Sequence, residues 1–173
     1  AIAQDVEQPN PEYEQLKVLN PMVGTYSMEG SNSAEGFKWE SLTTVSWSTS
    51  KKTLFAELKA RSAAADEDLS EQPWETGWRH SYVWNHDKNC IEMFDVQAMT
   101  GEVIVWKVKQ KEGGGFSYLP VSKTSNQTGR AEMEVTVTDI DVTMRLTNRV
   151  NADGEPLDDV KYTAKRIRQK QKR

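Results

Sequence analysis

The stretch "AEMEVTVTDIDVTMRLTNRV", residues 131–150, decides the fold class because apolar and polar side chains alternate along both of its halves. The apolar positions of the two halves are Ala131, Met133, Val135 and Val137, then Val142, Met144, Leu146 and Val150. Opposite the second set stand Thr143, Arg145, Thr147 and Arg149. The turn residues "TDID" at 138–141 separate the halves. A period of two around a short turn is typical of two half-buried antiparallel strands joined as a hairpin.

The same period recurs along most of the chain. We predict strands near residues 24–30, 38–48, 53–62, 77–84, 90–98, 102–110, 115–121, 129–138, 141–150 and 157–167. Turns rich in Gly, Asn and Asp separate them, and the polar stretch 62–76 with Pro73 is predicted to be a long loop. Consecutive hairpins favour a meander, and a meander of this size hides its edges by closing. The sequence therefore predicts an all-β fold, a closed or nearly closed antiparallel meander β-barrel of about ten strands.

A short helix is predicted before the first strand. Pro11 suits a first helical turn, and the acidic Glu12 and Glu14 favour the N-terminal end of a helix. Asn20 followed by Pro21 predicts the end of the helix. We expect this helix to cover one end of the barrel.

The 173 residues and the net charge of -4 bound the protein class. This length suits one domain, which we place at residues 11–168, with a flexible lead-in at 1–10 and a basic tail at 169–173. The basic end is predicted to be solvated, although an anionic partner surface is an alternative. A mildly acidic chain argues against nucleic-acid binding, and the absence of 18 consecutive apolar residues argues against a membrane-spanning helix. The oligomeric state stays open.

Two further features concern the compartment. The opening residues Ala1-Ile2-Ala3 resemble the end of a removed export signal, which predicts a periplasmic or secreted protein, with a cytoplasmic location as the alternative. The lone cysteine, Cys90, excludes an internal disulfide and is predicted to be a buried strand thiol. One thiol fits either compartment.

The start of the first strand carries a resemblance to a known family. "LKVLNPMVGTYSMEG" (16–30) resembles the short helix and Gly-x-Trp start of lipocalin-like proteins, with Tyr26 in place of the Trp two residues after Gly24. "HSYVWNHDKNCIEMFDVQAMTGE" (80–102) is similar to a mid-chain turn and strand of a bacterial lipocalin-like family of unknown function, with a calycin-type β-barrel. The resemblance covers roughly residues 14–167. It implies that a basic residue near the last strand, here Arg166, packs over Tyr26, and it transfers no catalytic residue.

The strand predicted at 77–84 carries four bulky side chains on one face, namely Trp78, His80, Tyr82 and Trp84. If that face points inward, His80 becomes a polar contact for a ligand in an aromatic wall, with Trp106 of another strand as a further contact. The alternatives are a core histidine with one hydrogen bond, or a row that faces outward. No cofactor and no metal site are predicted, since the two histidines lack a third ligand.

Three functions stay open at this point. The first is non-enzymatic binding of a small, partly apolar molecule inside the barrel. The second is a structural or protein-interaction module whose barrel is filled by tryptophan and methionine side chains. The third is a small enzyme with a site around His80. A visible internal cavity would separate the first two.

Overall fold

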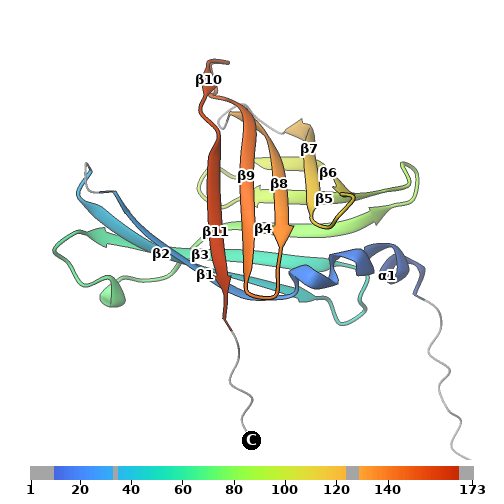
Figure 1. Ribbon diagram of the computed structural model, residues 1–173, viewed down its shortest axis with the longest axis horizontal. Coiled ribbons are helices and arrows are strands. Elements are labelled where there is room, and N and C mark those ends of the chain that lie inside the picture. Colours follow the sequence, from blue (N-terminus) through green and yellow to red (C-terminus); the bar gives the residue numbers. More distant parts are fainter. Residues whose placement is uncertain (1–9, 33–34, 124–128, 168–173) are drawn as a thin grey trace, which may run out of the picture.

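The computed structural model describes residues 10–32, 35–123 and 129–167. These residues form eleven strands, which follow one another with few interruptions (Figure 1). The strands are β1 (Gly24–Asn32), β2 (Phe37–Trp47), β3 (Leu54–Ala64), β4 (Glu75–Asn85), β5 (Cys90–Gln97), β6 (Val103–Gln110), β7 (Phe116–Lys123), β8 (Arg130–Val137), β9 (Asp141–Val150), β10 (Pro156–Leu157) and β11 (Val160–Arg166).

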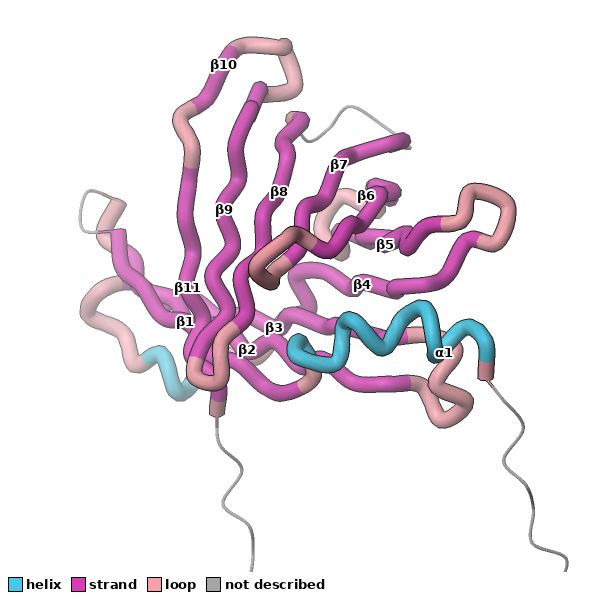
Figure 2. Tube along the Cα trace, turned by 45° about the vertical axis from the view of Figure 1, so that its right-hand side comes forward, coloured by secondary structure: helices cyan, strands magenta, loops and turns pink. Residues whose placement is uncertain are grey.

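The sheet closes on itself. Each strand from β1 to β9 pairs with the next, and β11 lies between β9 and β1, so ten strands form a ring and the two-residue β10 adds to β9. All pairings are antiparallel. In Figure 1, β8, β9 and β11 stand across the long, nearly horizontal β1, β2 and β3, and Figure 2 shows the same crossing from another side. The predicted antiparallel meander barrel is confirmed.

The pairing between β7 and β8 is short. Only Phe116, Ser117 and Tyr118 have register partners in β8. Beyond Tyr118, a surface cavity of about 310 Å³ lies between the two strands, with Pro120 and Arg130 among its lining residues. The barrel wall therefore has few paired positions between these two strands.

The core is formed by the inward-facing side chains of the strands. On β5, Ile91 and Met93 point inward and are at most 7% exposed, and they face Trp84 and Tyr82 of β4. The row predicted on β4 therefore faces the interior, because Tyr82 and Trp84 of this row pair with core residues. The core also contains Leu54, Val108, Phe116, Tyr118 and Val135.

The N-terminal helical segment packs on the core. The helix α1 (Pro11–Leu16) begins after Asn10, whose side chain accepts a hydrogen bond from the Tyr13 backbone N–H. A 3-10 helix, η1 (Lys17–Met22), follows, so the predicted end at Asn20 is wrong by two residues. Pro21 lies inside this 3-10 helix, whose last turn is closed by a hydrogen bond from the Val23 N–H to the Asn20 carbonyl.

The loop predicted at 62–76 is shorter than expected. β3 continues to Ala64 because its pairing with β2 extends that far, with Phe37 opposite Ala64, and β4 begins at Glu75. A short 3-10 helix, η2 (Leu69–Glu71), occupies the connection. The expectations for Ala1-Ile2-Ala3, for the rest of the lead-in up to residue 9 and for the tail at 169–173 lie outside the described residues. Within the described part of the chain, no helix is long and apolar enough to cross a membrane.

Candidate functional site

The inward row of β4 forms one wall of the barrel interior. The Trp78 and His80 rings stack in parallel, with centroids 3.8 Å apart and an interplanar angle of 7°. The Tyr82 ring meets His80 edge-on, with centroids 6.3 Å apart. This stacking holds the imidazole in one orientation beside the interior space.

A cavity of about 520 Å³, called here the large cavity, lies beside this wall. Its lining comes from strands β4 to β10 and from the turn after β9. The lining residues include Trp78, His80, Asp95, Gln97, Trp106, Lys123, Arg130, Ala131, Met133, Met144, Leu146, Arg149 and Leu157. Cavities of a few hundred cubic ångströms are the size that small molecules occupy.

One side of the large cavity is polar. The His80 Nε2 lies 3.2 Å from the Asp95 Oδ1, and the Gln97 amide donates to both Asp95 carboxylate oxygens at 2.8 Å. The Lys123 Nζ donates to the Gly129 carbonyl at 2.6 Å and lies 3.6 Å from a carboxylate oxygen of the buried Glu102. The buried Asp95 is thus held by side chains of the chain itself, which offsets the cost of desolvating its charge.

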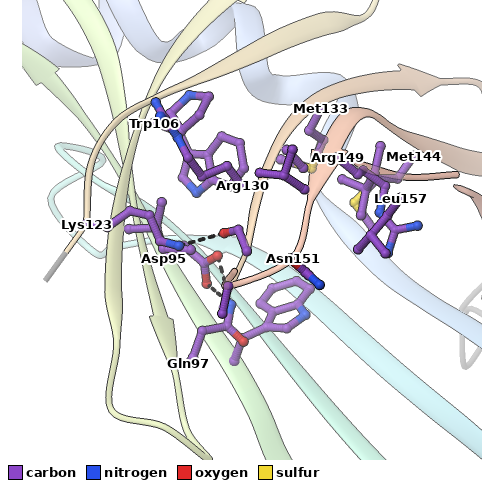
Figure 3. A pocket seen from close by; sticks show the side chains of 18 of the residues that line it. Asp95, Gln97, Trp106, Lys123, Arg130, Met133, Met144, Arg149, Asn151 and Leu157 are labelled. Carbon is purple, nitrogen blue, oxygen red and sulfur yellow. Dashed lines mark hydrogen bonds between the residues drawn. The ribbon is translucent and has the colours of Figure 1, made fainter. Parts of the chain in front are cut away.

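The opposite side carries apolar side chains together with Arg149. In Figure 3, Met133, Met144 and Leu157 stand across the cavity from Asp95, Gln97 and Lys123. Trp106, which lies above Lys123 and Asp95 in Figure 3, adds an indole ring that is 7% exposed. Its Nε1 is buried and has no acceptor among the described residues. An unpaired buried donor costs free energy, and an acceptor on a bound molecule would remove that cost.

A smaller cavity of about 120 Å³ lies against β1, β2 and β3 and is called here the small cavity. It shares Trp78, His80, Met133 and Met144 with the large cavity. Tyr82 also lines it. The four shared side chains therefore form a partition between the two spaces.

The buried tyrosines near the small cavity are held in their neutral form. The Tyr82 and Tyr118 hydroxyls are 3.4 Å apart, and the Tyr118 hydroxyl also donates to the Met22 sulfur at 3.7 Å. Burial raises the pKa of both phenols well above their usual range. At neutral pH this part of the interior is uncharged.

The predicted site residues separate into two groups. Trp78, His80 and Trp106 line the large cavity, and Tyr82 lines the small one. Trp84 lines neither of these two cavities and instead packs against the core opposite Ile91. The interior is therefore lined by Trp78 and Trp106, while other tryptophans lie elsewhere.

Three of those other tryptophans explain why the interior is not filled. Trp47 donates from its Nε1 to Asn20 of η1. Trp74 is 37% exposed, with the Arg61 guanidinium over its ring. Trp39 lines an outer groove together with the exposed Met99. Because these side chains lie outside the large cavity, its space stays open.

Gly24, Tyr26 and Arg166 meet where η1 enters β1. Arg166 stands directly across from Tyr26 in the β11–β1 pairing, as the resemblance implied, and its guanidinium lies over the Tyr26 ring. The Tyr26 hydroxyl donates to the Met22 carbonyl at 2.9 Å. Burial raises the pKa of this phenol, and the nearby Arg166 charge opposes the rise.

Sequence reasoning missed two groups of cavity residues. Asp95 and Gln97 follow Ile91 and Met93 on the inward face of β5, so alternation along "IEMFDVQ" could have identified them as inward polar residues. Arg149 was predicted on the outward face and instead lines the large cavity. The cause is Asn148, whose φ of 49° interrupts the alternation of β9.

The chemistry available in the large cavity is limited. His80 beside Asp95 can exchange a proton. Among the described residues that line it, no serine, threonine, cysteine or tyrosine supplies a hydroxyl or thiol nucleophile. The described part of the chain contains no group of three or more His, Cys, Asp or Glu side chains that could hold a metal ion. The geometry is that of a lined space with one polar side.

Comparisons with protein-family models, with curated proteins and with solved structures each find no match for this chain.

Proposed function

We propose that this chain is a lipocalin-like barrel that binds a small, largely apolar molecule in the large cavity without chemically changing it. The observation that carries the proposal is the open space of about 520 Å³ inside a closed barrel. A space of this size between aromatic and methionine side chains offers a ligand apolar contact area. The alternative of a filled barrel requires that space to be occupied.

Three details of the lining support binding. Trp78 and Trp106 present ring surfaces, and Met133 and Met144 present flexible thioethers that adapt to different ligand shapes. The polar side at Asp95 and His80 is already engaged within the chain. A ligand with an apolar body therefore gains contact area without displacing the buried contact between Asp95 and His80.

The experiment is a fluorescence titration with N-phenylnaphthylamine, a neutral dye that brightens in apolar surroundings. We expect saturable binding with one site per chain. Ala131→Trp adds an indole at a cavity-lining position of β8 and is expected to weaken dye binding at least about tenfold. The control is Thr136→Trp, which adds the same group at an exposed position of the same strand.

Two outcomes contradict the proposal. One is absence of dye binding by the folded parent chain. The other is equal affinity of the Ala131→Trp variant, with circular dichroism showing that this variant is folded.

Catalysis at His80 is the second candidate, and the adjacent Asp95 favours it because a carboxylate beside an imidazole supports proton transfer. The two functions differ in what His80→Ala removes. If the cavity only binds, this variant changes affinity. If the cavity catalyses, the variant abolishes turnover of a bound ester or amide and leaves its affinity nearly unchanged.

A further inference from the structure

The charges around the large cavity differ in sign from the chain as a whole. The chain has a net charge of -4. The cavity lining nevertheless contains three cationic side chains, Lys123, Arg130 and Arg149, and one carboxylate, Asp95. A local excess of positive charge in an acidic protein favours an anionic ligand at this place.

The four charged side chains differ in whether an oppositely charged or polar side chain of the protein contacts them. Asp95 is held by Gln97 and His80, and Lys123 lies near the carboxylate of Glu102. Arg149 donates from Nη1 to a neutral acceptor, the Asp158 backbone carbonyl. Within the described residues, no carboxylate lies within ion-pair distance of Arg130 or Arg149. The two arginines are therefore the cations that a ligand can neutralise.

The two arginines come from neighbouring strands. Arg130 at the start of β8 is the register partner of Val150, which directly follows Arg149 on β9. Arg130 is exposed and Arg149 is half-buried, whereas Asp95 and Trp106 are buried. Arg130 and Arg149 are thus the more exposed of these lining groups, and Asp95 and Trp106 are the more buried ones.

We infer that the bound molecule is an anionic amphiphile, a monocarboxylate whose acidic group pairs with Arg130 and Arg149 while its apolar body lies between Trp106 and the methionines. This inference rests on the proposed function and adds the chemical class of the ligand. Guanidinium groups match the geometry of a carboxylate, and their pairing is charge-assisted. The buried Asp95 repels a second anion, so the carboxylate stays at the outer end.

The test compares three ligands that differ only in the head group: decanoate, decanol and decylamine, each titrated by calorimetry below its aggregation concentration. We expect decanoate to bind about tenfold more tightly than decanol, which is at the lower end of the range for a hydrogen bond to a charged group. We expect decylamine to bind more weakly than both. In the variant with Arg130→Gln and Arg149→Gln, decanoate should lose this advantage while decanol affinity stays unchanged.

The matched control is Arg145→Gln. Arg145 lies on β9, is exposed, pairs with Asp159 at 2.9 Å and does not line the large cavity. This variant should keep the preference for decanoate. Binding of N-phenylnaphthylamine to the double variant checks that the cavity is intact.

Each other outcome has a defined meaning. Equal affinity for decanoate and decanol, or a preference for decylamine, overturns the anionic class and leaves cavity binding standing. A decanoate preference that persists in the double variant overturns the role of the two arginines. Failure of all three ligands and of the dye to bind the parent chain overturns the proposed function itself.

Discussion

The guanidinium carbon of Arg166 lies 5.0 Å from the centre of the Tyr26 ring. The same guanidinium donates from Nη1 to the Val23 carbonyl at 2.8 Å and from Nη2 to the Pro21 carbonyl at 2.6 Å. One side chain of the last strand thereby holds both the end of η1 and the first strand. The β1–β11 pairing that closes the barrel has only two register positions, so this side chain reinforces a short seam.

Arg166→Ala removes both hydrogen bonds and the cation–aromatic contact. We expect the free energy of unfolding to fall by about 2–3 kcal/mol, because bonds from a charged donor contribute more than neutral ones. Arg166→Lys keeps the charge, loses the forked geometry and should recover part of the loss. Urea denaturation measures both variants. A change below about 0.5 kcal/mol for Arg166→Ala, the range of ordinary surface substitutions, would contradict this role.

Gly24 makes room for the same guanidinium. A Cβ at position 24 would lie 3.1 Å from the Arg166 Nη1, and the φ of 150° there also favours glycine. Gly24→Ala should lower the free energy of unfolding by about 1–2 kcal/mol, and by less when Arg166 is already alanine. A double-mutant cycle isolates the crowding, because the backbone strain is common to both backgrounds. Strict additivity would rule the crowding out.

The buried tyrosine pair predicts an alkaline limit to stability. Burial raises the pKa of Tyr82 and Tyr118 in the folded chain, whereas an unfolded phenol ionises near its ordinary value of about 10. Above that pH the unfolded chain releases protons that the folded chain keeps. The free energy of unfolding therefore falls as the pH rises, by up to about 1.4 kcal/mol per pH unit for each tyrosine, and this term is constant below pH of about 9.

Tyr118→Phe tests this term. The variant loses a hydroxyl–hydroxyl contact at every pH, so its stability is lower at neutral pH, but the fall above pH of about 10 should be shallower. Urea denaturation at a series of pH values measures the two slopes. Identical slopes for the parent and the variant would show that this phenol does not contribute.

Trp78 and Trp84 form a matched pair for ligand binding. They lie on the same face of β4, and of the two only Trp78 lines the large cavity. Trp78→Leu should weaken binding of N-phenylnaphthylamine about tenfold through lost contact area, equivalent to roughly 1.4 kcal/mol. Trp84→Leu should lower stability and leave dye affinity unchanged. The reverse pattern would place the dye at the other end of β4.

Much of the fold follows from alternation in the sequence. On β8 and β9, Met133, Val135, Met144 and Leu146 show the period of two that antiparallel pairing requires, and the structure pairs them in that way. The inward direction of the His80 row is a tertiary property, because alternation defines two faces without saying which one is buried. The pairing of Tyr82 with Met93 and of Trp84 with Ile91 on β5 shows that the face with His80 is the buried one.

The cavity itself could not be predicted. Its volume depends on where the large side chains lie. Trp39 lies outside it against Gly30 of the neighbouring strand β1, and Trp47 lies outside it with a hydrogen bond to Asn20 of η1. Arg149 lines the cavity because the preceding residue, Asn148, has a left-handed backbone conformation that interrupts the alternation of β9. A single residue with positive φ in an otherwise regular strand gives no signal in a pattern of apolar and polar letters.

The six methionines test the central claim most directly. With methyl-labelled methionine, the titration with N-phenylnaphthylamine is followed by nuclear magnetic resonance. Met133 and Met144 line the large cavity, and Met99 is 94% exposed on the outer surface. Binding in the barrel predicts saturable shifts of the Met133 and Met144 methyl signals with the Met99 signal unchanged. A shifted Met99 signal with Met133 and Met144 unchanged would contradict a binding site inside the barrel.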